Sequence, residues 1–166
     1  MHPLVVQIRR MYAWAVRAAS LLQSPFLLFV RLYWGLQIAQ NGWGKLHNLT
    51  HVIEFFTSLN LPAPAFTAVF VSSVECVGGV FLALGVLSRF VGLVLSIDMF
   101  MAYITADREA LFSIFSDPDK FSAAAPFTIL FTALIILIFG PGLIALDTLL
   151  LRWLPYPWNQ KMETGK

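Results

Sequence analysis

The stretch that decides the fold is ECVGGVFLALGVLSRFVGLVL, residues 75–95, in which two apolar segments meet at a very short connection. Extending it outward gives apolar segments at 63–85 and 88–106, and further segments follow at 24–44 and 123–146. Each has about the 20 residues that a transmembrane helix needs. The chain of 166 residues is 58% hydrophobic and 12% charged, whereas soluble domains carry about 25% charged residues. The sequence therefore predicts an all-α fold, a four-helix transmembrane bundle.

The N-terminal residues 1–23 have a different pattern, in which apolar side chains share one side of a helix and Arg9, Arg10 and Arg17 the other. This pattern is typical of an amphipathic helix that lies in the membrane interface. A helical extension of the first span is the alternative. We thus divide the chain into an interfacial helix at 1–23, a four-span domain at 24–151 and an aromatic and basic tail at 152–166.

Lysine and arginine positions predict the orientation, because these residues are enriched on the cytoplasmic side. With both termini in the cytoplasm, seven of them lie inside, namely Arg9, Arg10, Arg17, Arg89, Arg152, Lys161 and Lys166. Three lie outside, namely Lys45, Arg108 and Lys120, the last two in an acidic loop at 107–120. We expect a multi-pass protein with both termini cytoplasmic.

Several functional classes are excluded or disfavoured by the composition. A net charge of +2 gives no basic footprint for nucleic acid. The single cysteine, Cys76, excludes an intramolecular disulfide and a CxxC redox pair. The chain shows no Ser-His-Asp arrangement, P-loop, GxGxxG fingerprint or CxxCH haem motif. We expect no intrinsic cofactor and assign no catalytic residue.

Three ionisable residues lie inside the predicted spans: Arg31, Glu75 and Asp98. Because a charge at the centre of a span costs about 2.5–3.5 kcal/mol, each needs a structural or functional reason. We expect Arg31 and Glu75 to form a buried ion pair between the first two spans. Such a pair can fix the helix register, form part of a polar pocket, or do both.

The predicted pocket also has an outer rim, formed where the first span ends. Lys45 shares a helix face with Arg31 and Gly42, and it is a candidate cation for Asp98, which is otherwise protonated. The candidate ligand-binding residues are Arg31, Gly42, Trp43, Lys45, Glu75 and Asp98. Trp43 also suits an aromatic belt. His47, His51 and Glu54 have the spacing of metal ligands, but without a fourth ligand we expect an interfacial segment and no metal site.

Two of these segments together resemble a known family. RLYWGLQIAQNGWGKL at 31–46 and the opening stretch at 75–95 are similar to the DoxX family of small bacterial four-span membrane proteins. The similarity covers about residues 24–106. It includes Arg31, Gly35, Gly42, Lys45, LNLPAP at 59–64, Glu75, Gly79, Gly85 and Arg89.

The resemblance implies a place in a membrane oxidoreductase system of the bacterial inner membrane. The expected role is a subunit that binds a quinone or a similar apolar small molecule, in contact with other subunits or a soluble redox enzyme. A non-catalytic accessory or scaffold subunit is the alternative, and a small transporter is a third hypothesis. Whether the chain is itself an enzyme is left open by the sequence.

Overall fold

The computed structural model describes residues 3–153, and this part of the chain consists of helices without any strand. Four helices make the bundle, namely α1 (Pro3–His47), α3 (Pro64–Leu84), α4 (Ser88–Thr105) and α7 (Ala125–Phe139). Shorter helices complete the described chain, namely α2 (Leu49–Ser58), α5 (Arg108–Phe112), α6 (Pro118–Ala123) and α8 (Leu146–Trp153). The prediction of an all-α helical bundle is confirmed.

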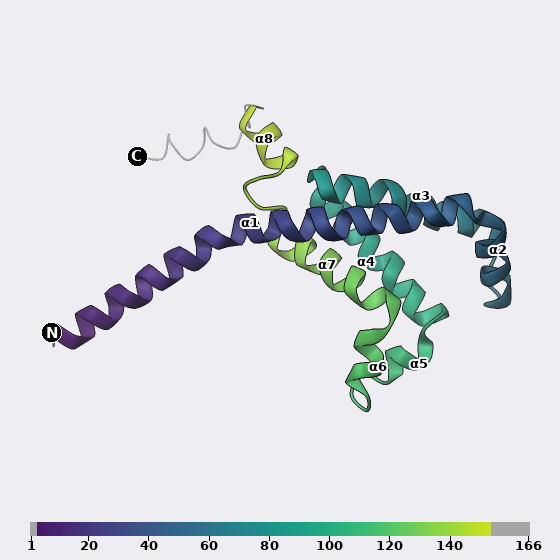
Figure 1. Cartoon of the computed structure of the whole chain (residues 1–166), viewed down its shortest axis with the longest axis horizontal. Helices are drawn as coiled ribbons and strands as arrows, with labels where there is room; N and C mark the ends of the chain where they lie inside the picture. The colour runs from purple at the N-terminus through teal and green to yellow at the C-terminus, as the bar shows by residue number, and fades with distance from the viewer. Residues whose placement is uncertain (1–2, 154–166) are drawn as a thin grey trace, which may run out of the picture.

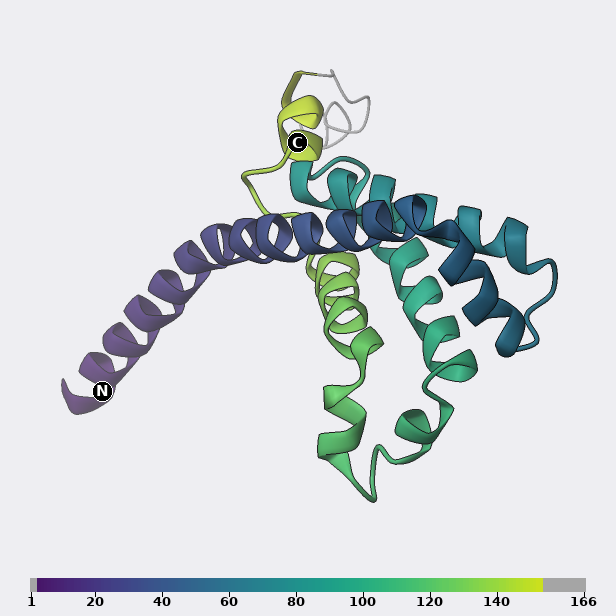
Figure 2. The same ribbon diagram turned by 45° about the vertical axis from the view of Figure 1, so that its right-hand side comes forward.

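Two helix pairs form the bundle. The bundle part of α1 lies antiparallel to α3, and α4 lies beside α7 (Figure 1). Figure 2 shows that the second pair crosses the first at a steep angle. A small apolar core joins the pairs, with Leu27, Ile38, Leu82, Leu95 and Ile136 almost fully buried. Three helices, α1, α3 and α4, are long and apolar enough to cross a membrane.

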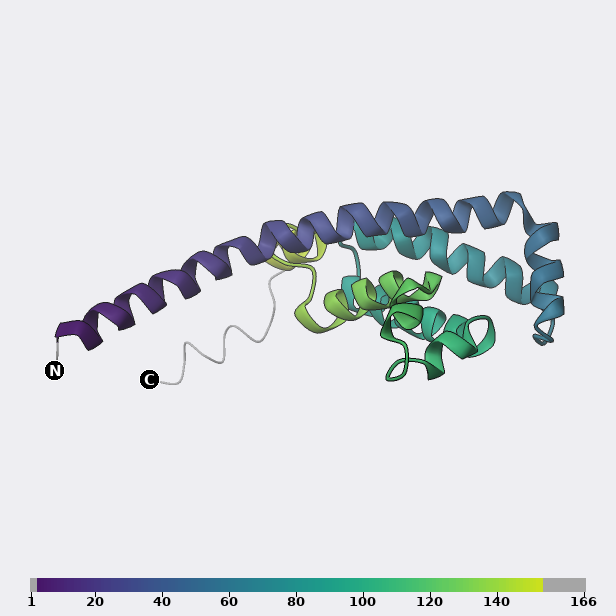
Figure 3. The ribbon, with the colours of Figure 1, turned by 60° about the horizontal axis from the view of Figure 1, so that its bottom comes forward.

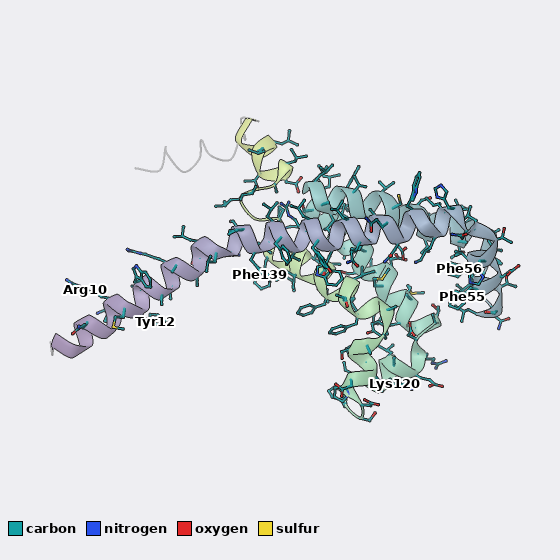
Figure 4. All side chains as sticks on the ribbon, viewed as in Figure 1. Arg10, Tyr12, Phe55, Phe56, Lys120 and Phe139 are labelled. Atoms are coloured by element: carbon teal, nitrogen blue, oxygen red, sulfur yellow. The ribbon has the colours of Figure 1, made fainter. Side chains whose placement is uncertain are left out.

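The first helix is continuous over 45 residues, with Pro25 inside it. Its N-terminal part leaves the bundle as a free arm (Figure 3), on which Met11, Tyr12 and Trp14 are strongly exposed. Figure 4 shows the side chains of Arg10 and Tyr12 on this arm, away from the other helices. The structure therefore has no break between residues 23 and 24. The interfacial position of this segment stays a prediction.

The fourth helix is shorter than the predicted span at 123–146. Helix α7 has 15 residues, about 22 Å at 1.5 Å per residue, whereas the hydrocarbon core is about 30 Å thick. It ends because Gly140 and Gly142 adopt positive φ angles of 76° and 80° on either side of Pro141. The expected continuous span was therefore wrong at its C-terminal end, since glycine and proline together terminate helices.

The connections place the functional side chains. The α3–α4 turn begins at Gly85, whose φ of 73° lets its N–H and that of Val86 bond back to the carbonyls of the last α3 turn. At the opposite end of α1, helix α2 leads back toward α3. The predicted acidic loop forms α5 and α6, which extend away from the α1–α3 pair (Figure 2). Of the predicted tail, residues 154–166 lie outside the described part.

Candidate functional site

Small residues bring the α1 and α3 backbones into direct contact. A Cβ on Gly35 would lie 2.8 Å from the Ala83 nitrogen, and a Cβ on Gly42 would lie 2.7 Å from the Ser72 carbonyl oxygen. Gly79 faces Ala39 between these two contacts. Close approach through small residues is a common way for membrane helices to pack. These contacts fix the axial register of the two helices.

The register separates Arg31 from Glu75, so the predicted ion pair between them is wrong. Arg31 lies level with Gly85, because a Cβ on Gly85 would overlap the guanidinium. Gly85 and Glu75 are ten residues apart in the sequence, which corresponds to about 15 Å along a helix. Arg31 instead donates a hydrogen bond to the carbonyl oxygen of Ile144, in the segment between α7 and α8.

Glu75 is paired with Lys45. The Lys45 Nζ atom lies 2.5 Å from the Glu75 Oε1 atom, with the lysine side chain 39% exposed and the glutamate side chain 2% exposed. Lys45 comes from the last turn of α1, and its long aliphatic stem allows the ammonium group to reach Glu75 from the rim. The lysine thus connects the surface of the bundle to a buried carboxylate.

Asp98 is the third member of this group. Gly78 on α3 faces Leu95 on α4, since a Cβ on Gly78 would lie 3.3 Å from the leucine side chain. Glu75 lies one turn before Gly78 on α3 and Asp98 one turn after Leu95 on α4, so both carboxyl groups lie near the place where these two helices meet. Asp98 interacts electrostatically with both Glu75 and Lys45. We call Lys45, Glu75 and Asp98 the acid–lysine cluster; its three members come from α1, α3 and α4.

Several polar atoms in and beside the acid–lysine cluster have unused hydrogen-bonding capacity. The Oε2 atom of Glu75, the Oδ2 atom of Asp98 and the Oγ atom of Ser72 are buried and lack a hydrogen-bond partner within the described chain. Ser72 lies one turn before Glu75 and is fully buried. Buried polar atoms are normally paired, since an unmade bond costs about 1–3 kcal/mol. The cluster therefore offers donors and acceptors to a polar group that enters it.

The other candidates lie outside this cluster. The Trp43 side chain is 60% exposed, and its ring packs against that of His47 with centroids 4.3 Å apart. Gly42 contacts the α3 backbone at Ser72 and Cys76. The described residues contain no group of three or more histidine, cysteine or acidic side chains that could hold a metal ion.

A second polar group, missed by the sequence analysis, surrounds Arg31. The Asp147 carboxylate accepts hydrogen bonds from the backbone N–H groups of Leu87 and Ser88, at 2.7 and 2.8 Å. It also interacts electrostatically with Arg31, whose Nε and Nη1 atoms are buried without a partner in the described chain. Asp147 follows the Gly-Pro-Gly sequence at 140–142 by only a few residues. That sequence could have indicated that the chain turns back at this point and brings Asp147 toward the other helices.

Comparison with known proteins agrees with this architecture. The family model of DoxX matches residues 26–108, which include all of α3 and α4 and the acid–lysine cluster. The Bacillus subtilis (strain 168) protein named "Putative oxidoreductase CatD" is 28% identical over 120 residues, which cover 72% of this chain and 83% of that protein. No solved structure matches the chain significantly. The chain is a membrane protein that belongs to the DoxX family.

Proposed function

We propose that this chain is a subunit of a membrane oxidoreductase system and binds a quinone, or a similarly apolar carbonyl compound, at the acid–lysine cluster. The observation that carries the proposal is the Lys45–Glu75 pair with Asp98 and Ser72 beside it, a polar group with unmade hydrogen bonds inside an apolar helix bundle. The name of the relative, "Putative oxidoreductase CatD", supports the reaction class.

The chemistry of the cluster suits a quinone. A quinone carbonyl oxygen only accepts hydrogen bonds, and donors are available in the Lys45 ammonium group and in the Ser72 hydroxyl group one turn before Glu75, which is unpaired within the described chain. Lys45 uses one of its three N–H groups on Glu75. The carboxylates of Glu75 and Asp98 can accept hydrogen bonds from the hydroxyl groups of the reduced form. Any electron transfer requires the quinone and a redox group on a partner, because the chain contains none of the redox motifs considered above.

Retention of quinone during purification tests this proposal. The protein is purified in mild detergent, its lipids are extracted, and quinones are quantified by mass spectrometry per mole of protein. We expect Lys45→Met and Glu75→Gln to lose the bound quinone. The matched control is Lys120→Met, which breaks the exposed Lys120–Glu109 pair at 3.0 Å and should retain it. A wild-type protein without quinone, or equal retention in all variants, contradicts the proposal.

A non-catalytic accessory subunit is the second candidate function, and the free arm of α1 favours it. Its side chains Met11, Tyr12 and Trp14 are 68–74% exposed within the described part of the chain. An arm that carries Arg9, Arg10 and Arg17 as well can attach to the membrane surface or to a partner subunit. Purification of a stable larger complex that contains no quinone would favour this role over ligand binding.

We place the protein in the bacterial inner membrane with both termini in the cytoplasm. In this orientation the α1–α2 connection and the α5–α6 hairpin face outward, and the α3–α4 turn faces the cytoplasm. The excess of lysine and arginine on the cytoplasmic side supports this placement. The acid–lysine cluster then lies toward the outer side and Arg31 toward the inner side of the α1–α3 pair.

A further inference from the structure

The acid–lysine cluster is unbalanced in charge. It contains one lysine and two carboxyl groups, so its formal charge is −1 when both carboxyl groups are ionised. The neighbouring helices supply little compensation. Helix α7 carries no charged side chain, and Arg31 lies at the other end of the contact between α1 and α3, where it bonds to the Ile144 carbonyl. On and before α2, the ionisable groups are His47, His51 and Glu54, all exposed, and His47 bonds to the Trp43 carbonyl.

Burial makes this excess charge costly. The side chain of Glu75 is 2% exposed, and one carboxyl oxygen each of Glu75 and Asp98 is buried without a hydrogen-bond partner in the described chain. An unpaired carboxylate in an apolar environment is strongly disfavoured, and two neighbouring carboxylates disfavour each other. Glu75 is compensated by its direct contact with Lys45, whereas Asp98 has no such contact with a cation among residues 3–153.

We infer that the acid–lysine cluster is a proton-binding site, in which Asp98 carries one exchangeable proton while Glu75 stays ionised against Lys45. The proton arrives from water, and its uptake converts the carboxylate of Asp98 to a carboxylic acid and brings the cluster from −1 to neutral. A proton suits the site better than a metal ion, because the Lys45 ammonium group already lies against Glu75 and would repel a second cation there.

The proton also changes what the cluster can bind. A carboxylate only accepts hydrogen bonds, but a carboxylic acid donates one. Protonated Asp98 would supply a hydrogen bond to a carbonyl oxygen of the ligand, a consequence that rests on the proposed function. Deprotonation would then remove that donor and weaken ligand retention. Proton binding itself needs no quinone, so the two proposals can fail separately.

Infrared spectroscopy of the full-length protein in lipid tests the inference. At neutral pH we expect a protonated-carboxyl carbonyl band that shifts in deuterated water and is lost in Asp98→Asn. The control is Asp119→Asn, which alters an exposed acid on α6 and should leave the band unchanged. A band that persists in Asp98→Asn, or no protonated-carboxyl band in the wild type, overturns the inference.

Two further variants and a salt titration test the assignment of the band to Asp98 and the identity of the bound ion. In Lys45→Met the compensating cation is lost, so Glu75 should also become protonated and the band area should roughly double. If Asp98→Asn does not fold, Asp98→Glu should keep the band at a displaced frequency, and an unchanged frequency contradicts the assignment. If added sodium chloride abolishes the wild-type band, while potassium chloride does not, the cluster binds a cation in place of a proton and the inference is overturned.

Discussion

Arg31 and Gly85 occupy adjoining positions where α1 meets the α3–α4 turn, and any Cβ on Gly85 would overlap the guanidinium group. Arg31 is 1% exposed at this position and bonds to the Ile144 carbonyl. Gly85 also needs its positive φ of 73° to form the turn. One glycine therefore allows both the helix end and the burial of the arginine.

Gly85→Ala should lower the free energy of unfolding by about 1–3 kcal/mol from backbone strain at positive φ alone. The displacement of the Arg31 side chain should add to this loss. Thermal unfolding in detergent measures the effect. Gly44→Ala is the matched control, since a Cβ there meets nothing within 4 Å. An alanine is favourable in a helix, so this control should be neutral or slightly stabilising. Equal melting of both variants would contradict the structural role of Gly85.

Gly79→Ala should destabilise the protein more than Gly78→Ala. A Cβ on Gly79 would collide with the α1 backbone at Ala39, which cannot move without separating the helices. A Cβ on the adjacent Gly78 meets only the flexible Leu95 side chain at 3.3 Å. The two melting temperatures in one detergent give the comparison. A more damaging Gly78→Ala would show that α1 and α3 do not pack in this register.

Lys45→Met should destabilise the protein because it leaves the buried Glu75 carboxylate without its cation. Loss of one partner of a buried pair costs about 3–5 kcal/mol, and the partial exposure of Lys45 reduces this to about 1–3 kcal/mol. The double variant Lys45→Met with Glu75→Leu should recover most of the loss. Lys120→Met, in the exposed pair with Glu109, provides the control. If the single and double variants unfold alike, Lys45 and Glu75 are not coupled.

Asp147→Asn should weaken the attachment of the C-terminal segment to the α3–α4 turn. The Asp147 carboxylate accepts hydrogen bonds from the backbone N–H groups of Leu87, which precedes α4, and Ser88, its first residue. Loss of such a helix cap costs about 0.5–2 kcal/mol. Hydrogen exchange of the amides of Leu87 and Ser88 reports the change directly. Asp119→Asn serves as control, and unaltered exchange in Asp147→Asn would rule out the cap.

The proposed orientation predicts which introduced cysteines react with a reagent added outside the cell. In a Cys76→Ser background, Ser58→Cys on α2 and Ser116→Cys between α5 and α6 should react with a membrane-impermeant maleimide in intact cells. Arg10→Cys on the free arm should react only after the membrane is opened. All three positions are exposed. The reverse labelling pattern would place the termini outside.

The sequence by itself determined the helical class, the approximate limits of the second and third spans, the C-terminal end of the first span and the residues that cannot face lipid. These properties depend on composition and on which side of a helix a residue occupies, both of which are local. The Gly-Pro-Gly sequence at 140–142 is also a local signal, and it ends α7. The apolar residues on either side of it nevertheless led to the prediction of one continuous span at 123–146.

Only the tertiary structure decided which acid meets which base. Arg31, Lys45, Glu75 and Asp98 were all identified from the sequence, yet Glu75 pairs with Lys45 instead of Arg31. Helical periodicity gives the face on which a side chain lies, but it does not give the axial offset between two antiparallel helices. That offset is set by the joint fit of Gly35, Gly42 and Gly79 against the opposing backbones, because backbones can approach closely only where small residues coincide.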